Sequence, residues 1–280
     1  PSNSKHSVLF SHPTQRPAFI PRSRTELKTA VNTCLKVFPK GYCSNGLHGP
    51  IGGWDVSRIS DMSNMFSYAK SFRGDITKWD VSNVRDMSGM FRSARLFNAD
   101  ISKWDVSSVT DMSKMFLRAR DFNSDISKWD VSSVTDMTAM FGCTRVTAFD
   151  RDISKLDVSS TTKVSSMFNS AMSFNGDLSK WDVSRVISMC SMFMGAKLFN
   201  GDLSKWDVSS VVDMSFIFSH AELFNGDIRN WDVSSVANMD EMFFHATSFN
   251  QKLCGADWIN SKATKKGRFD GSPGSEAQMM

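Results

Sequence analysis

The chain of 280 residues contains only two tyrosines, although it has 22 phenylalanines, 18 methionines and eight tryptophans. It lacks any run of 18 apolar residues, so the sequence predicts no transmembrane span. No asparagine begins an N-x-[ST] glycosylation sequon. The five cysteines, an odd number, do not make a disulfide framework. The large excess of a few residue types instead indicates a short pattern copied many times.

Tryptophan marks a unit that recurs every 25 residues and reads W-D-V-S-x-V-x-D-M-S-x-M-F-x-x-A-x-x-F-N-G-D-I-S-K. One register shift occurs, because residues 142–148 hold two extra residues. A 25-residue period lies within the range of about 20–29 residues that leucine-rich repeats show. Eight units begin at Trp54, Trp79, Trp104, Trp129, Leu156, Trp181, Trp206 and Trp231, and a degraded ninth start lies near Trp258.

Two apolar periodicities within one unit predict its local structure. Met62, Met65, Phe66 and Ala69 have the i, i+3, i+4, i+7 spacing of one face of a short helix. Residues 72–76 alternate apolar and polar side chains, as a short strand does. The predicted fold is therefore an α/β repeat solenoid, leucine-rich-repeat-like, in which eight to nine coils share one apolar spine.

The sequence divides the chain into four expected parts, three of which lie outside the repeats. Residues 1–22, with four prolines and no acid, predict an extended basic arm. Residues 23–53 predict an N-terminal cap helix and lead-in, because Ser23 and Glu26 form a capping box before an apolar helical face. The solenoid is expected over residues 54–258. Residues 259–280 predict a polar, basic C-terminal tail.

The repeat resembles that of the DUF285 family, which is grouped with BspA-like leucine-rich-repeat proteins. The resemblance is carried by W-D-V-S-S-V-x-D-M-S, by M-F and by F-N-G-D-L-S-K-W-D-V-S, and it covers about residues 54–253. It implies a leucine-rich-repeat-like solenoid with surface or interaction roles and no enzyme activity. The unit from Leu156 departs from the pattern at Thr161, Lys163 and Val164, which predicts a local irregularity.

Columns of asparagine and aspartate at equivalent repeat positions are the main candidate contacts for a partner. Binding surfaces of solenoids usually lie on such repeated faces, and the basic N-terminal residues add a second set. The aspartates could also bind calcium, but the unit lacks the G-G-x-G-x-D spacing of calcium-binding β-rolls, so turn hydrogen bonding is the favoured interpretation. The predicted contacts are Asn98, Asn123, Asn175, Asn200, Asn225, Asp100, Asp125, Asp177, Asp202, Asp227, Arg16, Arg22 and Arg24.

Catalysis is not expected, because the polar residues of the repeats occur in many copies and no nucleophile–base arrangement stands out. No cofactor or metal site is predicted. The methionine columns beside phenylalanine are expected to fill the core. Cys34 and Cys43 lie close enough in sequence to pair as a disulfide.

The expected function is binding of a protein partner. An alternative is an accessory subunit of a large assembly, such as an organellar membrane complex, held by the basic ends; a calcium-dependent surface adhesin is a third hypothesis. A net charge of +4 is too small to imply nucleic acid, whereas the basic ends leave peripheral membrane association open. The compartment stays open between cell surface and organelle, and the start at Pro1 suggests that a targeting segment has been removed.

Overall fold

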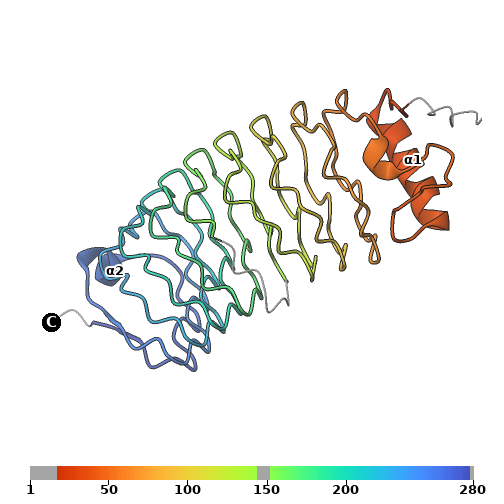
Figure 1. Cartoon of the computed structure of the whole chain (residues 1–280). Helices are drawn as coiled ribbons and strands as arrows, with labels where there is room; N and C mark the ends of the chain where they lie inside the picture. The colour runs from red at the N-terminus through yellow and green to blue at the C-terminus, as the bar shows by residue number, and fades with distance from the viewer. Residues whose placement is uncertain (1–17, 144–151, 278–280) are drawn as a thin grey trace, which may run out of the picture.

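The computed structural model describes residues 18–143 and 152–277, which form an elongated stack of similar coils (Figure 1). Helix α1 (Arg24–Val37) lies at the N-terminal end of the stack and helix α2 (Ala256–Asn260) at the other end. A 3-10 turn, η1 (Ile51–Gly53), leads into the first coil. The short strands β1 (Lys252–Leu253) and β2 (Ser275–Glu276) pair in parallel near the C-terminus. We number the coils from coil 1 at Trp54 to coil 9 at Trp258. Positions are counted from the tryptophan, or from Leu156 in coil 5; in coil 9 they follow the register with coil 8, so that Thr264, which bridges Asn238, is position 8.

A ladder of backbone hydrogen bonds joins each coil to the next. Parallel bridges connect position 8 of successive coils, beginning with Asp61 and Asp86 and ending with Asn238 and Thr264. Amides at positions 9, 11, 13 and 15 donate to carbonyls of the following coil, as in Met62 N to Asp86 O at 2.8 Å. These bonds all run toward the next coil, so positions 8–15 have a carbonyl end at coil 1 and an amide end at coil 9. The position 7 amides donate the opposite way, as in Arg85 N to Ser60 O at 2.8 Å.

The segment expected to be a short helix is a series of tight turns instead. Asn64 and Tyr68, at positions 11 and 15, have φ values of 53° and 62°, in the left-handed region. Alternation of right- and left-handed residues turns every second amide toward the next coil, whereas a helix would direct these amides along its own axis. The remaining amides close i to i+3 turns, such as Met65 N to Met62 O at 3.2 Å. Residues 72–76, expected to be a strand, likewise form no regular strand.

Aromatic side chains fill the interior in columns parallel to the stack. The phenylalanines at positions 13 and 19 stack within a coil and between coils: the rings of Phe91 and Phe97 are 3.8 Å apart, and those of Phe91 and Phe116 are 5.8 Å apart. Each repeat tryptophan from Trp79 onward is buried. Its indole N–H donates to a backbone carbonyl about one repeat earlier in the chain, as in Trp79 to Ile51 O at 2.9 Å. These bonds satisfy the polar atom that burial of an indole would otherwise leave unpaired.

The N-terminal end is covered by α1. Ser23 is its N-cap and accepts a hydrogen bond from Glu26 N at 3.2 Å. Leu27, Ala30 and Val31 pack against the core. Cys34 on this helix is joined to Cys43 by a disulfide with a Cα–Cα distance of 5.7 Å, within the usual range.

Residues 259–277 lie against the stack, where the sequence predicted a polar tail. Thr264 N donates to Ala237 O, and Phe269 stacks on Phe243 with a centroid distance of 5.5 Å. The segment therefore forms most of coil 9. Its sequence hides this because few of the repeat's marker residues remain: Phe269 keeps the position 13 phenylalanine, but Arg268 replaces the position 12 methionine.

Candidate interaction surface

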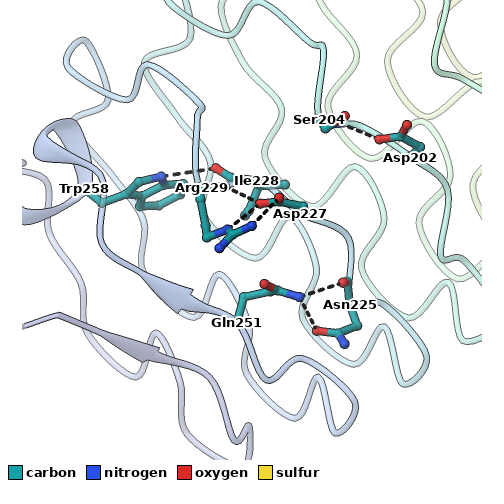
Figure 2. Close-up of polar contacts among 8 residues, drawn as sticks. All are labelled: Asp202, Ser204, Asn225, Asp227, Ile228, Arg229, Gln251 and Trp258. Atoms are coloured by element: carbon teal, nitrogen blue, oxygen red, sulfur yellow. Dashed lines mark hydrogen bonds and ion pairs between the residues drawn. The ribbon is translucent and has the colours of Figure 1, made fainter.

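The predicted asparagine column is a hydrogen-bonded ladder within the stack. Asn98 Oδ1 accepts from Asn123 N at 2.8 Å, and Asn175 Oδ1 accepts from Asn200 N at 2.9 Å. Asn225 continues the column: its Oδ1 accepts from Asn250 N and from the side chain of Gln251 (Figure 2). The side-chain oxygens of this column therefore stabilise the stacking of coils.

The predicted aspartate column stabilises local turns. Asp100, Asp177 and Asp202 each accept a hydrogen bond from the backbone N–H two residues later, as in Ser204 N to Asp202 Oδ1 at 2.9 Å (Figure 2). Asp125 does the same with Ser127 N. Hydrogen bonds from the side chain and backbone of Ser204 lower the pKa of Asp202. Each carboxylate thus has one oxygen in its own turn and projects outward on an exposed face.

Asp227 differs from the rest of its column. Arg229 stands where coils 1 to 6 have serine or threonine, and its guanidinium forms two hydrogen bonds with the Asp227 carboxylate, at 2.9 and 2.8 Å (Figure 2). These bonds, with the backbone N–H of Arg229, lower the pKa of Asp227 to about 2. An already paired carboxylate offers less to a partner than its neighbours do.

The basic residues expected to bind a partner at the N-terminal end have different roles. Arg24 is committed to the fold: its Nη2 donates to Ser63 O at 2.7 Å, and its Nε lies 3.1 Å from Asp61 Oδ1. Arg22 is exposed beside α1, and its backbone N–H donates to Glu26. Arg16 lies outside the described residues.

A groove along one edge of coils 1 to 5 is the strongest candidate for partner contact. It is a hollow of about 460 Å³ between the columns formed by positions 15 and 17. Position 16 is alanine in coils 1, 2, 3 and 5; Ala94 and Ala119 face inward and are fully buried, so in coils 2 and 3 no larger side chain fills the space between the columns. We call this hollow the basic groove; it is lined by Tyr68, Lys70, Ser93, Arg95, Arg118, Arg120, Cys143, Ser170 and Met172.

Positive charge is concentrated and unbalanced in the basic groove. Lys70, Arg95, Arg118 and Arg120 are all exposed, and among the described residues none of the four has a carboxylate within 4.0 Å. The nearby Asp121 pairs with Arg73 instead, at 3.8 Å. These cations are therefore available to an anionic ligand.

In the later coils, the columns at positions 15 and 17 no longer carry an excess of positive charge. Gly195 and His220 occupy position 15, and the position 17 residues Lys197 and Glu222 neutralise each other at 2.5 Å. The basic groove thus belongs to the first half of the stack. A sum of charges does not reveal the groove, because carboxylates in other columns offset its cations. The signal was present, since Lys70, Arg95 and Arg120 are 25 residues apart.

The described residues contain no group of three or more histidine, cysteine, aspartate and glutamate side chains arranged to hold a metal ion. Across the same residues, neither helix combines the length and the apolar composition needed to traverse a bilayer.

These features define the class of the protein, a repeat protein built from stacked 25-residue units. A family model described as "Mycoplasma protein of unknown function, DUF285" matches residues 37–147 and 177–272. The chain therefore belongs to the DUF285 family. Between the two matched segments lies most of the irregular unit that begins at Leu156. No curated protein and no solved structure significantly matches the chain.

Proposed function

We propose that the chain is a non-catalytic, leucine-rich-repeat-like solenoid of the BspA-like type that binds a protein partner through its edge and caps. Its core is continuous from Leu27 to Ala263, so the surface side chains are carried on one packed scaffold. Such scaffolds suit binding because ordering the surface costs little further entropy when a partner arrives.

The observation that carries this proposal is the uncompensated charge of the basic groove. Successive coils are about 4.8 Å apart, and two like charges 4 Å apart in water repel by about 1 kcal/mol. At position 17 of the later coils Lys197 pairs with Glu222, whereas Lys70, Arg95 and Arg120 at the same position have no carboxylate within 4.0 Å among the described residues. A partner of opposite charge would relieve this repulsion.

A second candidate function is that of an accessory subunit in a larger assembly. The observation that favours it is the amide end of the ladder. The backbone amides of Lys265, Gly267, Phe269 and Gly271 occupy the positions that donate to the next coil elsewhere, and within residues 18–143 and 152–277 they have no acceptor. A neighbouring subunit that presents carbonyl oxygens could cover this end.

Sizing the native protein tests the proposed function. We expect the endogenous chain to elute well above its own 31.3 kDa at physiological salt, with cross-links to a protein, and to shift toward the monomer in 1 M salt. Elution as an uncross-linked monomer at physiological salt would contradict the proposal. A native complex that survives 1 M salt and cross-links through residues 264–277 would favour the accessory subunit.

A further inference from the structure

We propose that the basic groove binds an extended, carboxylate-rich segment of a partner protein, lying along the axis of the stack. This inference rests on the proposed function and identifies the chemistry of the partner. It concerns side chains that the turns, ladders and caps described above do not use.

Arginine predominates among the cations of the groove. Its planar guanidinium binds a carboxylate through two parallel hydrogen bonds, which a lysine ammonium does not do. Arg95, Arg118 and Arg120 project into one hollow with Lys70, and the hydroxyl groups of Ser93 and Ser170 lie beside them. A ligand with several carboxylates would find a charged or neutral donor in coils 1, 2, 3 and 5.

The spacing of the cations favours an extended chain. Lys70, Arg95 and Arg120 occupy one position in three successive coils, at intervals of about 4.8 Å. An extended peptide rises about 3.3 Å per residue, so the four steps between coils 1 and 5 match about six residues. The alanine floor leaves room for the backbone of such a segment between the two columns.

The groove continues toward α1. A neighbouring hollow of about 490 Å³ shares Tyr68 and Lys70 with it and is also lined by Lys28 and Lys36. The Lys28 ammonium is already bound to the carbonyls of Asn64 and Met65, at 2.7 and 2.8 Å, whereas Lys36 is exposed. A longer acidic segment would therefore reach Lys36.

The surroundings of the groove argue against a nucleic acid or a membrane as its ligand. Proteins that bind single strands offer aromatic faces on which bases stack. Among the described residues that line the groove, Tyr68 is the only aromatic one, and it already carries the Arg92 guanidinium at 5.3 Å from its ring centroid. Membrane-surface binding uses an outward amphipathic face or a basic patch, but these cations line a hollow that a narrow chain can enter.

Binding of a fluorescent hexaglutamate peptide, followed by anisotropy in low salt, tests the inference. The groove variant Arg95→Gln/Arg120→Gln removes two cations from position 17 of coils 2 and 3. The control Lys103→Gln/Lys128→Gln removes two exposed cations from position 25 of the same coils, with the same change in net charge. We expect the groove variant to weaken binding at least tenfold and the control to weaken it less than twofold.

Cysteine labelling gives a second readout on the native chain. Cys143 lines the groove, whereas Cys254 is exposed near α2, far along the stack. We expect the peptide to slow maleimide labelling of Cys143 at least threefold and to leave the rate at Cys254 unchanged. Equal protection of both thiols would show that the peptide does not choose the groove.

Three outcomes would overturn the inference: equal losses for the groove variant and its control, no binding of hexaglutamate, or groove-dependent binding only of an RNA oligomer or of phosphatidylserine vesicles. The proposed function is judged separately, with the native cross-linked partner. If the groove variant still forms that complex, the inference fails and the proposed function stands. If wild-type protein forms no complex but binds hexaglutamate through the groove, the peptide site stands and the proposed function fails.

Discussion

The two ends of the stack finish the same ladder in opposite ways. At coil 1, carbonyls that have no preceding coil face α1, where Arg24 donates to Ser63 O and Lys28 donates to Met65 O. At coil 9, the unpaired groups are amides, and two inward positions are charged: Arg268 replaces the methionine of position 12, and Glu276 lies in register with Leu253. Along positions 8–15, coil 1 therefore presents carbonyls that donors such as Arg24 and Lys28 can cover, whereas coil 9 presents amides that need acceptors.

The C-terminal end is the more vulnerable of the two, because its ion pair is the more buried. Arg268 is 4% exposed, and its guanidinium contacts the Glu276 carboxylate and lies over the ring of Phe269 at 4.7 Å. Burial lowers the pKa of Arg268, and the charge of Glu276 opposes that shift. Removing one member of such a pair leaves the other uncompensated.

The largest effect is therefore expected for Arg268→Ala, which should lower the free energy of unfolding of the last coils by about 3 kcal/mol. Because repeat stacks open unit by unit, amide exchange in coils 8 and 9 should accelerate while coil 1 is unchanged. The control Arg268→Met/Glu276→Leu restores apolar residues at both positions and should recover most of the loss. If Arg268→Ala were as stable as wild type, this account of the C-terminal end would be wrong.

Removing the cations at the other end is expected to cost less. Arg24→Ala/Lys28→Ala should destabilise coil 1 by about 2 kcal/mol, because hydrogen bonds from charged groups are lost but water can reach the carbonyls. The measurement is amide exchange in coil 1 against coil 8. Thr29→Ala, at an exposed site on the same helix, is the control and should have little effect.

A variant at an interior junction shows how much one ladder bond contributes away from the two ends. Asn200 Oδ1 accepts from Asn225 N at 2.8 Å, so Asn200→Ala should lower the free energy of unfolding by about 1 kcal/mol. Asn200→Asp keeps an acceptor and should lose less. Urea titration of the three proteins gives the order; equal losses for the two variants would show that the acceptor is not what matters.

The smallest effect concerns the pH dependence of coil 7. The folded pKa of Asp227, about 2, lies below its ordinary value of 3.8, so the ionised group stabilises the fold above that ordinary value. This contribution is lost as the pH falls through about 2. The carboxylate is 43% exposed, so solvent screens the pair and the change in stability is small.

Arg229→Ser restores the serine found at this position in most other units and should raise the pKa of Asp227 toward that of Asp202. Carboxyl NMR titration of both residues measures the change, with Asp202 as the internal reference. An unchanged Asp227 would exclude the arginine as the main cause.

Some of these features could be predicted from the sequence and others could not. The period and the buried Trp, Met and Phe positions follow from repetition and hydrophobicity. The turns were mistaken for helices because Met62, Met65 and Phe66 have helical spacing, while the left-handed position between them accepts residues as different as Asn64 and Lys114. Spacing alone does not reveal the sign of φ.

The candidate site was harder to predict than the core. Asn98 and Asp100 attract attention because they recur, but a recurring polar residue is often one that the stacking itself requires, as the ladder and turn bonds show. Arg95 and Arg120 vary to lysine, methionine, glutamate or threonine in other units, so they look like noise in the pattern. In a repeat protein, residues that depart from the pattern make one part of the surface differ from the rest. These are the positions at which the protein can select a partner.

The repeated ladder also has an evolutionary consequence. Every interior junction offers the same carbonyls and amides, so duplicating or deleting one whole 25-residue unit between the two ends leaves each junction chemically unchanged. The length of such a molecule is free to drift by whole units, while Arg24, Lys28, Arg268 and Glu276 must stay with their terminal coils. Loss of either terminus, by contrast, would expose the cut edge of the ladder.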